Sequence, residues 1–342
     1  MSRVSSLPGT VASRRAALRL MASAASVLAL EGCAALSESG ARLDIPELSA
    51  HPTLLVATTR KPANGARAKP WFGPERAAKV TIARAKLTPP DQGRFSRASV
   101  GLSDWRLDAI ETVPQVGDLL RHAINTRDVL LYVHGFNQTF EAAALDAARL
   151  SDGIRFGGET MVFSWPSKAQ LLDYGYDRES AMWSRDALEQ VLAGLIASPA
   201  SARIHLVAHS IGTMLTMEAL RQIYARQPGT AVERIGAVVF AAPDIDMDVF
   251  TSSVERIGPL APRITVVTAT NDRALAVSGW FAGGVKRVGV AEQAQLKQLG
   301  LHVIDASQQG WGIINHDLFL SNARIREVIR RAIDGRPIDR AI

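Results

Sequence analysis

The alternation of short apolar runs with helical patterns is the feature that most constrains this chain. The runs are Val129–Val133, Met161–Trp165, Ile204–Ala208, Ile235–Ala241, Ile264–Ala269 and Leu301–Asp305. Short continuous apolar runs are typical of strands buried on both faces. A helical pattern follows each run, beginning with the alanine-rich stretch Thr139–Leu150. Such alternation predicts the α/β class, with a mostly parallel, doubly wound sheet and helices on both of its faces.

Three earlier segments complete this expectation. Thr53–Thr59 and Lys79–Leu87 have the β-branched composition of strands, and the apolar spacing within Val116–Asn125 predicts a helix. The body shows no internal repeat and no further shift of composition, so we expect a single domain over residues 51–342.

The first 32 residues differ from this body and predict a signal peptide. They hold four arginines and one acid, Glu31, and the apolar run Leu20–Leu30 is shorter than the roughly 20 residues that span a bilayer. The string Ser13–Arg19 (SRRAALR) resembles the twin-arginine export motif, with Ala17 in place of the usual Phe. An ordinary basic leader is the alternative.

Cys33 is the only cysteine of the chain, and it follows Leu30-Glu31-Gly32 in a string that resembles a lipobox. The charged Glu31 departs from that pattern, so a conventional cleavage site beside a stray cysteine is the alternative. Lipidation at Cys33 would make residues 33–50 a tether and the membrane a partner. Ala34 after the cysteine then favours the outer membrane, on its periplasmic side, if the sorting rule of enteric bacteria applies.

Charge and motif content exclude several other classes of function. Half of the net charge of +6 belongs to the leader, and the remaining +3 forms no stripe of Lys and Arg, so we expect no nucleic-acid partner. The sequence holds no H-E-x-x-H, paired C-x-x-C, Walker A or G-x-G-x-x-G motif. We therefore expect no metal and no cofactor.

The string 208–212 (AHSIG) stands where a strand meets a helix, after the third of the apolar runs. In open parallel sheets, ligands bind beyond the carboxyl ends of the strands. The string resembles the nucleophile elbow G-x-S-x-G of α/β-hydrolases, with Ala208 replacing the first glycine, and Ser210 is the candidate nucleophile. The alternative is a serine that caps an ordinary helix.

A serine nucleophile needs a histidine base and a carboxylate that orients it. The resemblance implies the chain order serine, acid, histidine, which leaves His302 and His316 downstream. His302 begins its strand at the far edge of the sheet, so His316, in the loop after that strand, is the candidate base. Strand counting favours Asp272 as the acid. Asp244 or Asp246, one strand earlier, stay open as alternatives, although the run 244–248 also suits helix capping.

The string 134–137 (HGFN) resembles the oxyanion loop of the same fold. The resemblance implies that the N–H groups of Phe136 and Ile211 bind the oxyanion, and that Gly135 lets the backbone turn. His134, Asn137, His209 and Tyr176 are candidates for the substrate pocket. The alternatives are structural roles for the two histidines, and a solvated helix face for Tyr176 and its charged neighbours.

Over about residues 51–333 the chain resembles a bacterial family of largely uncharacterised α/β-hydrolases. The matching strings are 57–62 (ATTRKP), 134–137, 163–167 (FSWPS), 176–184 (YDRESAMWS), 205–212, 242–250 (APDIDMDVF), 271–275 (NDRAL) and the late His316. The resemblance implies an esterase-like core but no defined substrate. Together with the candidate triad, it leads us to expect a carboxylesterase-like serine hydrolase acting on a small-molecule or lipid-like ester. The competing hypothesis is a lipid-anchored envelope binding or assembly protein without turnover.

Overall fold

The structure is a computed structural model that describes residues 53–63, 68–90, 105–114, 127–269, 275, 286–307 and 318–338. The predicted leader and tether, including Cys33, lie outside these residues, as does the predicted helix over 116–125.

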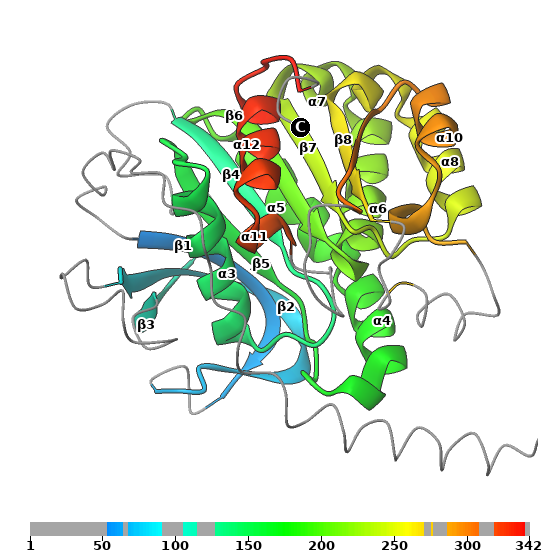
Figure 1. The fold of residues 1–342 in the computed structure, drawn as a ribbon. Coiled ribbons are helices and arrows are strands. Elements are labelled where there is room, and N and C mark those ends of the chain that lie inside the picture. Colours follow the sequence, from blue (N-terminus) through cyan, green and yellow to red (C-terminus); the bar gives the residue numbers. More distant parts are fainter. Residues whose placement is uncertain are drawn as a thin grey trace, which may run out of the picture. The chain divides into compact units, whose positions relative to one another are not determined.

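The described residues form one nine-stranded sheet with the order β3-β2-β1-β5-β4-β6-β7-β8-β9 (Figure 1). Its strands are β1 (Thr53–Pro62), β2 (Phe72–Thr88), β3 (Arg106–Val113), β4 (Arg127–Val133), β5 (Glu159–Ser164), β6 (Ser201–His209), β7 (Ile235–Ala241), β8 (Ile264–Thr268) and β9 (His302–Asp305). From β1 to β9 every neighbouring pair is parallel, while β1–β2 and β2–β3 are antiparallel. The predicted α/β class and mostly parallel sheet are therefore confirmed.

The helices alternate with the parallel strands. They are α3 (Phe140–Gly153), α4 (Tyr174–Trp183), α5 (Arg185–Ala197), α6 (Ile211–Arg226), α7 (Pro228–Arg234), α8 (Met247–Arg256), α10 (Gln293–Gln298), α11 (Leu318–Ser321) and α12 (Ala323–Ile333), with 3₁₀ turns η2 (Leu171–Asp173), η3 (Gly258–Arg263) and η4 (Val288–Val290). Within the described ranges, every helix is too short or too polar to cross a bilayer.

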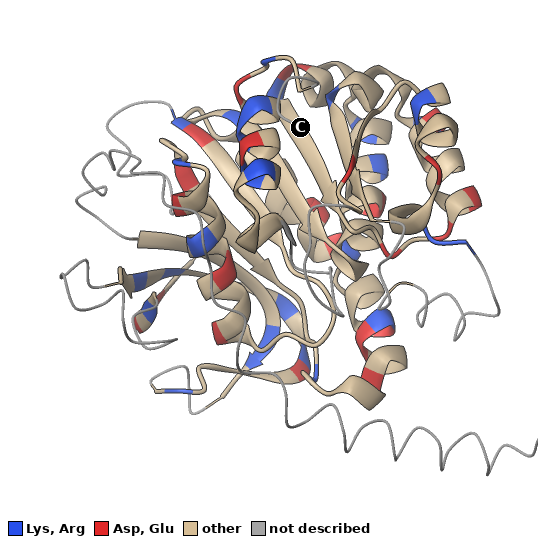
Figure 2. Ribbon diagram, in the orientation of Figure 1, with Lys and Arg blue, Asp and Glu red and all other residues tan. Residues whose placement is uncertain are grey.

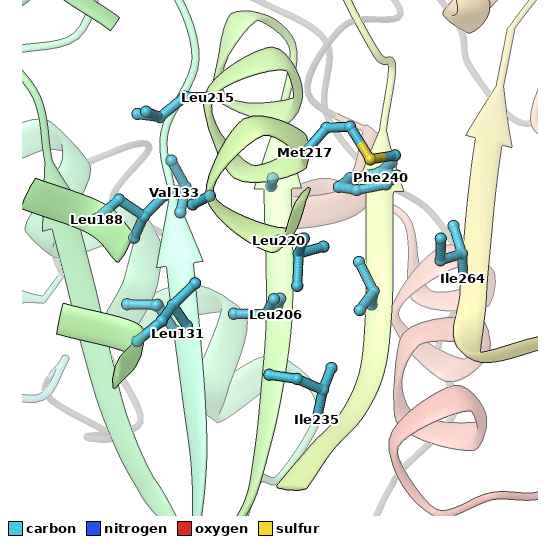
Figure 3. Close-up of a cluster of buried hydrophobic side chains, with 14 of the residues drawn as sticks. Leu131, Val133, Leu188, Leu206, Leu215, Met217, Leu220, Ile235, Phe240 and Ile264 are labelled. Carbon is cyan, nitrogen blue, oxygen red and sulfur yellow. The ribbon is translucent and has the colours of Figure 1, made fainter. Parts of the chain in front are cut away.

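Side chains that alternate along the strands divide the core into two layers. Leu131, Leu206 and Phe240 point to the face covered by α4, α5, α6 and α8, where they pack with residues such as Leu188 and Leu220 (Figure 3). The intervening residues, such as Tyr132 and Val207, point to the opposite face and pack against α3 and α12. Strands β7 and β8 carry no charged residue, and the charges lie mostly on the helices and outer strands (Figure 2).

The antiparallel side of the sheet departs most from the sequence expectation. β2 begins at Phe72, seven positions before the predicted start at Lys79, and β3 was not predicted. Most side chains of β3 are exposed, so its sequence lacks the apolar run that marks the central strands. His302 begins β9 at the opposite edge, as expected, and its side chain is exposed.

The core layer on the α6 face predicts the effect of one truncation. Leu206 is fully buried, so Leu206→Ala should lower the free energy of unfolding by about 2–5 kcal/mol through lost apolar contacts and a residual cavity. Leu172 is 100% exposed, so Leu172→Ala should change it by less than about 0.5 kcal/mol. Urea unfolding of both variants measures the difference, and equal losses would contradict the assigned core.

Candidate active site

Ser210 occupies a sharp turn between β6 and α6. Its backbone has φ 52° and ψ −124°, a conformation that costs a non-glycine residue about 1–3 kcal/mol. Three backbone hydrogen bonds hold it: the Ser210 N–H donates to Ala241 O at 3.0 Å, and its carbonyl accepts from Thr213 N at 3.0 Å and Asp244 N at 3.1 Å. This geometry differs from the β-region backbone of an ordinary N-cap serine, and no side-chain cap hydrogen bond forms.

Two glycines let the neighbouring backbone reach this turn. A Cβ on Gly212 would lie 2.4 Å from the His134 carbonyl oxygen, so only glycine lets α6 start against the end of β4. A Cβ on Gly135 would lie 2.9 Å from the Cβ of Ser210 and 2.8 Å from Nδ1 of His209. The predicted oxyanion loop therefore packs directly against the predicted nucleophile.

The two predicted oxyanion donors belong to the start of α6 and to the loop that follows β4. Ile211 is the first residue of α6, where an N–H has no partner within the helix and the helix dipole favours negative charge. Phe136 follows Gly135, and its ring packs edge-on against Tyr174 with centroids 5.5 Å apart. Within the described residues, neither the Phe136 nor the Ile211 N–H donates a hydrogen bond.

His134 lies fully buried beneath the loop that it begins. Its ring stacks on Trp165 with centroids 4.6 Å apart, and its Nδ1 lies 2.8 Å from the Gly135 carbonyl oxygen. Burial, together with the nearby positive Arg60, lowers the pKa of His134 to about 3. The ring is therefore neutral at pH 7, and its contacts with Trp165 and the Gly135 carbonyl are structural.

The other predicted pocket residues occupy three different places. His209 is buried with its ring against Phe319 of α11, at a centroid distance of 4.7 Å. Asn137 is exposed, with φ 60°. Tyr176 donates from its hydroxyl to Pro74 O at 3.0 Å, and the cationic groups of Arg76 and Lys168 lie 4.9 and 4.5 Å from its ring centroid. These contacts of Tyr176 are with β2 and the loop before α4.

A buried polar network, which was not predicted from the sequence, forms hydrogen bonds to the loop 134–138. Arg60, at the end of β1, is 1% exposed and donates to Ser164 Oγ at 2.9 Å, Ser167 O at 2.9 Å and Gln138 O at 2.7 Å. Burial lowers the pKa of its guanidinium to about 10, so Arg60 stays protonated at pH 7. The string 57–62, which is part of the family resemblance, contains Arg60, but it gives this residue no role.

Asp177 of α4 is the acidic member of this network. It is fully buried, contrary to the solvated helix face considered as an alternative. Its carboxylate accepts from the Ser167 hydroxyl at 2.5 Å, from Lys168 N at 2.8 Å and from Asn137 N at 3.2 Å. Burial raises the pKa of Asp177, and these hydrogen bonds oppose the shift.

The candidate base and the favoured acid, His316 and Asp272, lie outside the described residues. Of the alternatives, Asp244 is buried, forms an ion pair with Arg287 at 3.1 Å and accepts from the Tyr174 hydroxyl at 2.8 Å. Asp246 caps α8 by accepting from Asp248 N and Val249 N, each at 3.0 Å. No group of three or more His, Cys, Asp or Glu among the described residues is arranged to hold a metal.

Comparison with known proteins places the chain in a family. A family model described as "Alpha/beta hydrolase of unknown function (DUF900)" matches residues 115–332. The chain belongs to this family. This α/β-hydrolase of unknown function is also 34% identical to the uncharacterized protein alr1448 of Nostoc sp. (strain PCC 7120) over 61 residues, which are 18% of this chain and 16% of that protein.

Solved hydrolases show a distant likeness. A "predicted CIB-like hydrolase" from Thermoplasma acidophilum is 13% identical, with 75% of this chain and 91% of that one covered at a TM-score of 0.37. An esterase from Pyrobaculum calidifontis is 12% identical, with 74% and 80% covered at a TM-score of 0.34. The fold is therefore assigned from the family match and from the strand order, not from these structures.

The buried neutral His134 predicts a pH dependence of stability. Because its folded pKa of about 3 lies below the usual 6.5, its contribution is complete above pH 6.5 and is lost as the pH falls toward 3. One additional proton on the unfolded chain gives a slope of about 1.4 kcal/mol per pH unit. Urea unfolding between pH 6 and 4 should show this excess slope in the wild type relative to His134→Asn. Parallel profiles of the two proteins would contradict it.

Proposed function

We propose that this α/β-hydrolase is a carboxylesterase-like serine hydrolase that cleaves an ester-type acyl bond through an acyl-enzyme. The observation that carries the proposal is the backbone of Ser210, with φ 52° and ψ −124° at the junction of β6 and α6. This turn holds a serine at the carboxyl end of the sheet and directly against Gly135, where the fold places its ligands.

The proposed reaction has two halves. Ser210 Oγ attacks the ester carbonyl carbon while His316 accepts the hydroxyl proton, and the Phe136 and Ile211 N–H groups bind the oxyanion. Collapse of this intermediate breaks the bond to the alcohol, which leaves with the proton from His316. Water, deprotonated by His316, then attacks the acyl-enzyme. The second intermediate collapses to the free acid as the bond to Ser210 Oγ breaks and His316 returns the proton to that oxygen. Asp272 orients His316 and stabilises its charged form.

Residues that lie near His316 and Asp272 in the chain support these roles. Phe319, three positions after His316, packs on His209, which directly precedes Ser210. Asp272 follows β8, two strands from β6 in the sheet. The alternative acids already have other tasks, since Asp244 pairs with Arg287 and Asp246 caps α8.

Covalent labelling tests the nucleophile. A fluorophosphonate probe should label the wild-type protein and leave Ser210→Ala unlabelled, because only an activated serine hydroxyl displaces the leaving group from phosphorus. Ser253→Ala is the matched control, since Ser253 is also buried but lies on α8 with its hydroxyl bonded to Val249 O. Equal labelling of the wild type and Ser210→Ala would end the proposal. Absence of turnover on a panel of nitrophenyl esters of increasing chain length would favour the binding or assembly protein.

Two asparagine variants decide between the acids. Asp272→Asn should lower kcat by about 10³- to 10⁴-fold, because the neutral amide no longer stabilises the histidine in the required form. Asp244→Asn should instead mainly lower the free energy of unfolding, by about 3–5 kcal/mol, because it leaves the buried Arg287 charge without its carboxylate. Steady-state kinetics and urea unfolding of both variants separate the two effects. The reverse pattern would assign the triad acid to Asp244.

We further propose that the hydrolase acts in the cell envelope, lipid-anchored through Cys33 to the outer membrane. The leader pattern and the lipobox-like string support this location. In cells, Cys33→Ala should move the protein from the membrane fraction to the soluble periplasmic fraction, because the thioether-linked lipid is lost. Unchanged fractionation would count against the anchor and leave the proposed chemistry unaffected.

A further inference from the structure

The inference concerns Arg60, a buried cation in the family-like string 57–62 to which the proposed reaction gives no task. Its guanidinium has only N–H donors, and its Nε donates to Ser164 Oγ at 2.9 Å. The Ser164 hydroxyl therefore accepts from Arg60 and keeps one proton to donate. His134 Nε2 lies 3.3 Å from Ser164 Oγ and is the nitrogen that can accept this proton.

The contact of the other ring nitrogen, Nδ1, favours the same protonation state of His134. Nδ1 lies 2.8 Å from the Gly135 carbonyl oxygen, which is an acceptor, so a proton must stand on Nδ1 to avoid opposing lone pairs. The doubly protonated ring is excluded at neutral pH because burial and Arg60 hold the pKa of His134 near 3. Nε2 is then unprotonated. It lies 3.2 Å from the Trp165 carbonyl oxygen, so the Ser164 hydroxyl supplies its favourable contact.

The bond from Nδ1 to the Gly135 carbonyl has a consequence for the next amide. A trans peptide unit is planar, and its C=O and N–H point in opposite directions. Holding the Gly135 oxygen toward His134 therefore turns the Phe136 N–H away from His134. The same peptide unit borders Ser210, because a Cβ on Gly135 would lie 2.9 Å from the Ser210 Cβ.

We propose that Arg60 is a positioning residue for the oxyanion hole. Through the Ser164 hydroxyl it fixes the Nδ1–H tautomer of His134, and His134 in turn holds the Gly135–Phe136 peptide so that the Phe136 N–H faces the substrate oxygen. Arg60 also donates to Gln138 O at 2.7 Å, so it holds this loop at both ends. The inference rests on the proposed function, since only the proposed reaction uses the Phe136 N–H.

The tautomer of His134 is the direct test, and it needs no turnover. In protein labelled with ¹⁵N-histidine, the His134 ring signals are assigned by their loss in His134→Asn. The wild type should show a protonated Nδ1 and an unprotonated Nε2 near pH 7. In Ser164→Ala the proton should partly move to Nε2, where the Trp165 carbonyl accepts it. A wild-type ring protonated on Nε2 would overturn the proposal.

Kinetics tests the effect on the reaction. Ser164→Ala should lower kcat on a nitrophenyl ester by about 10- to 100-fold, somewhat less than the loss of a whole oxyanion donor, and leave KM within about twofold. Ser164→Thr keeps the hydroxyl and should restore most of kcat. An Ala variant with unchanged kcat would overturn the proposal.

Ser180→Ala is the matched control for a merely structural effect. Ser180 is fully buried and also accepts from an arginine Nε at 2.9 Å, that of Arg76, but it lies on α4, and among the described residues its side chain forms no hydrogen bond to the loop 134–138. It should lose stability as Ser164→Ala does and keep its kcat; an equal loss of kcat would overturn the positioning role. A folded wild type that neither hydrolyses esters nor reacts with the fluorophosphonate would refute the proposed function instead. In that case the His134 tautomer would still test the hydrogen bonds that run from Arg60 through Ser164 to His134.

Discussion

The site depends on the close approach of three backbones where β4, β6 and α6 meet. Ser210 turns the chain from strand to helix in one residue, and Gly212 lets the helix begin against the carbonyl oxygen of His134. A left-handed serine is unfavourable by itself, so the surrounding hydrogen bonds to Ala241 and Asp244 must hold it. The strain and the geometry of the candidate site have the same origin, because the turn that gives Ser210 its unfavourable φ also packs it against Gly135.

Two charged side chains near this turn are buried, where a charged group is energetically unfavourable. Arg60 and Asp177 are both almost without solvent exposure. Burial lowers the pKa of Arg60 and raises the pKa of Asp177, which in each case favours the neutral form. Hydrogen bonds to backbone groups and to Ser164 and Ser167 compensate for the lost water. Such a network is costly to break at one member, because each partner would then be left buried and unsatisfied. That cost favours the arrangement of the loop 134–138 in which all of these hydrogen bonds form.

The central strands and the turn at Ser210 were predictable because their information is local. The apolar runs mark β4 to β9, and the string 208–212 places a serine between a strand and a helix. Arg60 was not predictable as a site residue, because its partners Gln138 and Ser164 lie 78 and 104 positions away. Strand β3 was missed for a different reason, since its largely exposed side chains leave no apolar pattern. The acid and base rest on the order of the motifs along the chain.

The position of β1 limits how far this hydrolase can be truncated from its N-terminal side. The family match begins at residue 115, yet β1 pairs with β5 inside the sheet and carries Arg60. A fragment trimmed to the matched residues would expose the edge of β5 along Met161–Ser164 and remove the donor that satisfies the Gln138 and Ser167 carbonyls. An open parallel edge invites pairing with other chains. The smallest piece that keeps this site intact therefore starts at or before Thr53, well upstream of residue 115, where the family match begins.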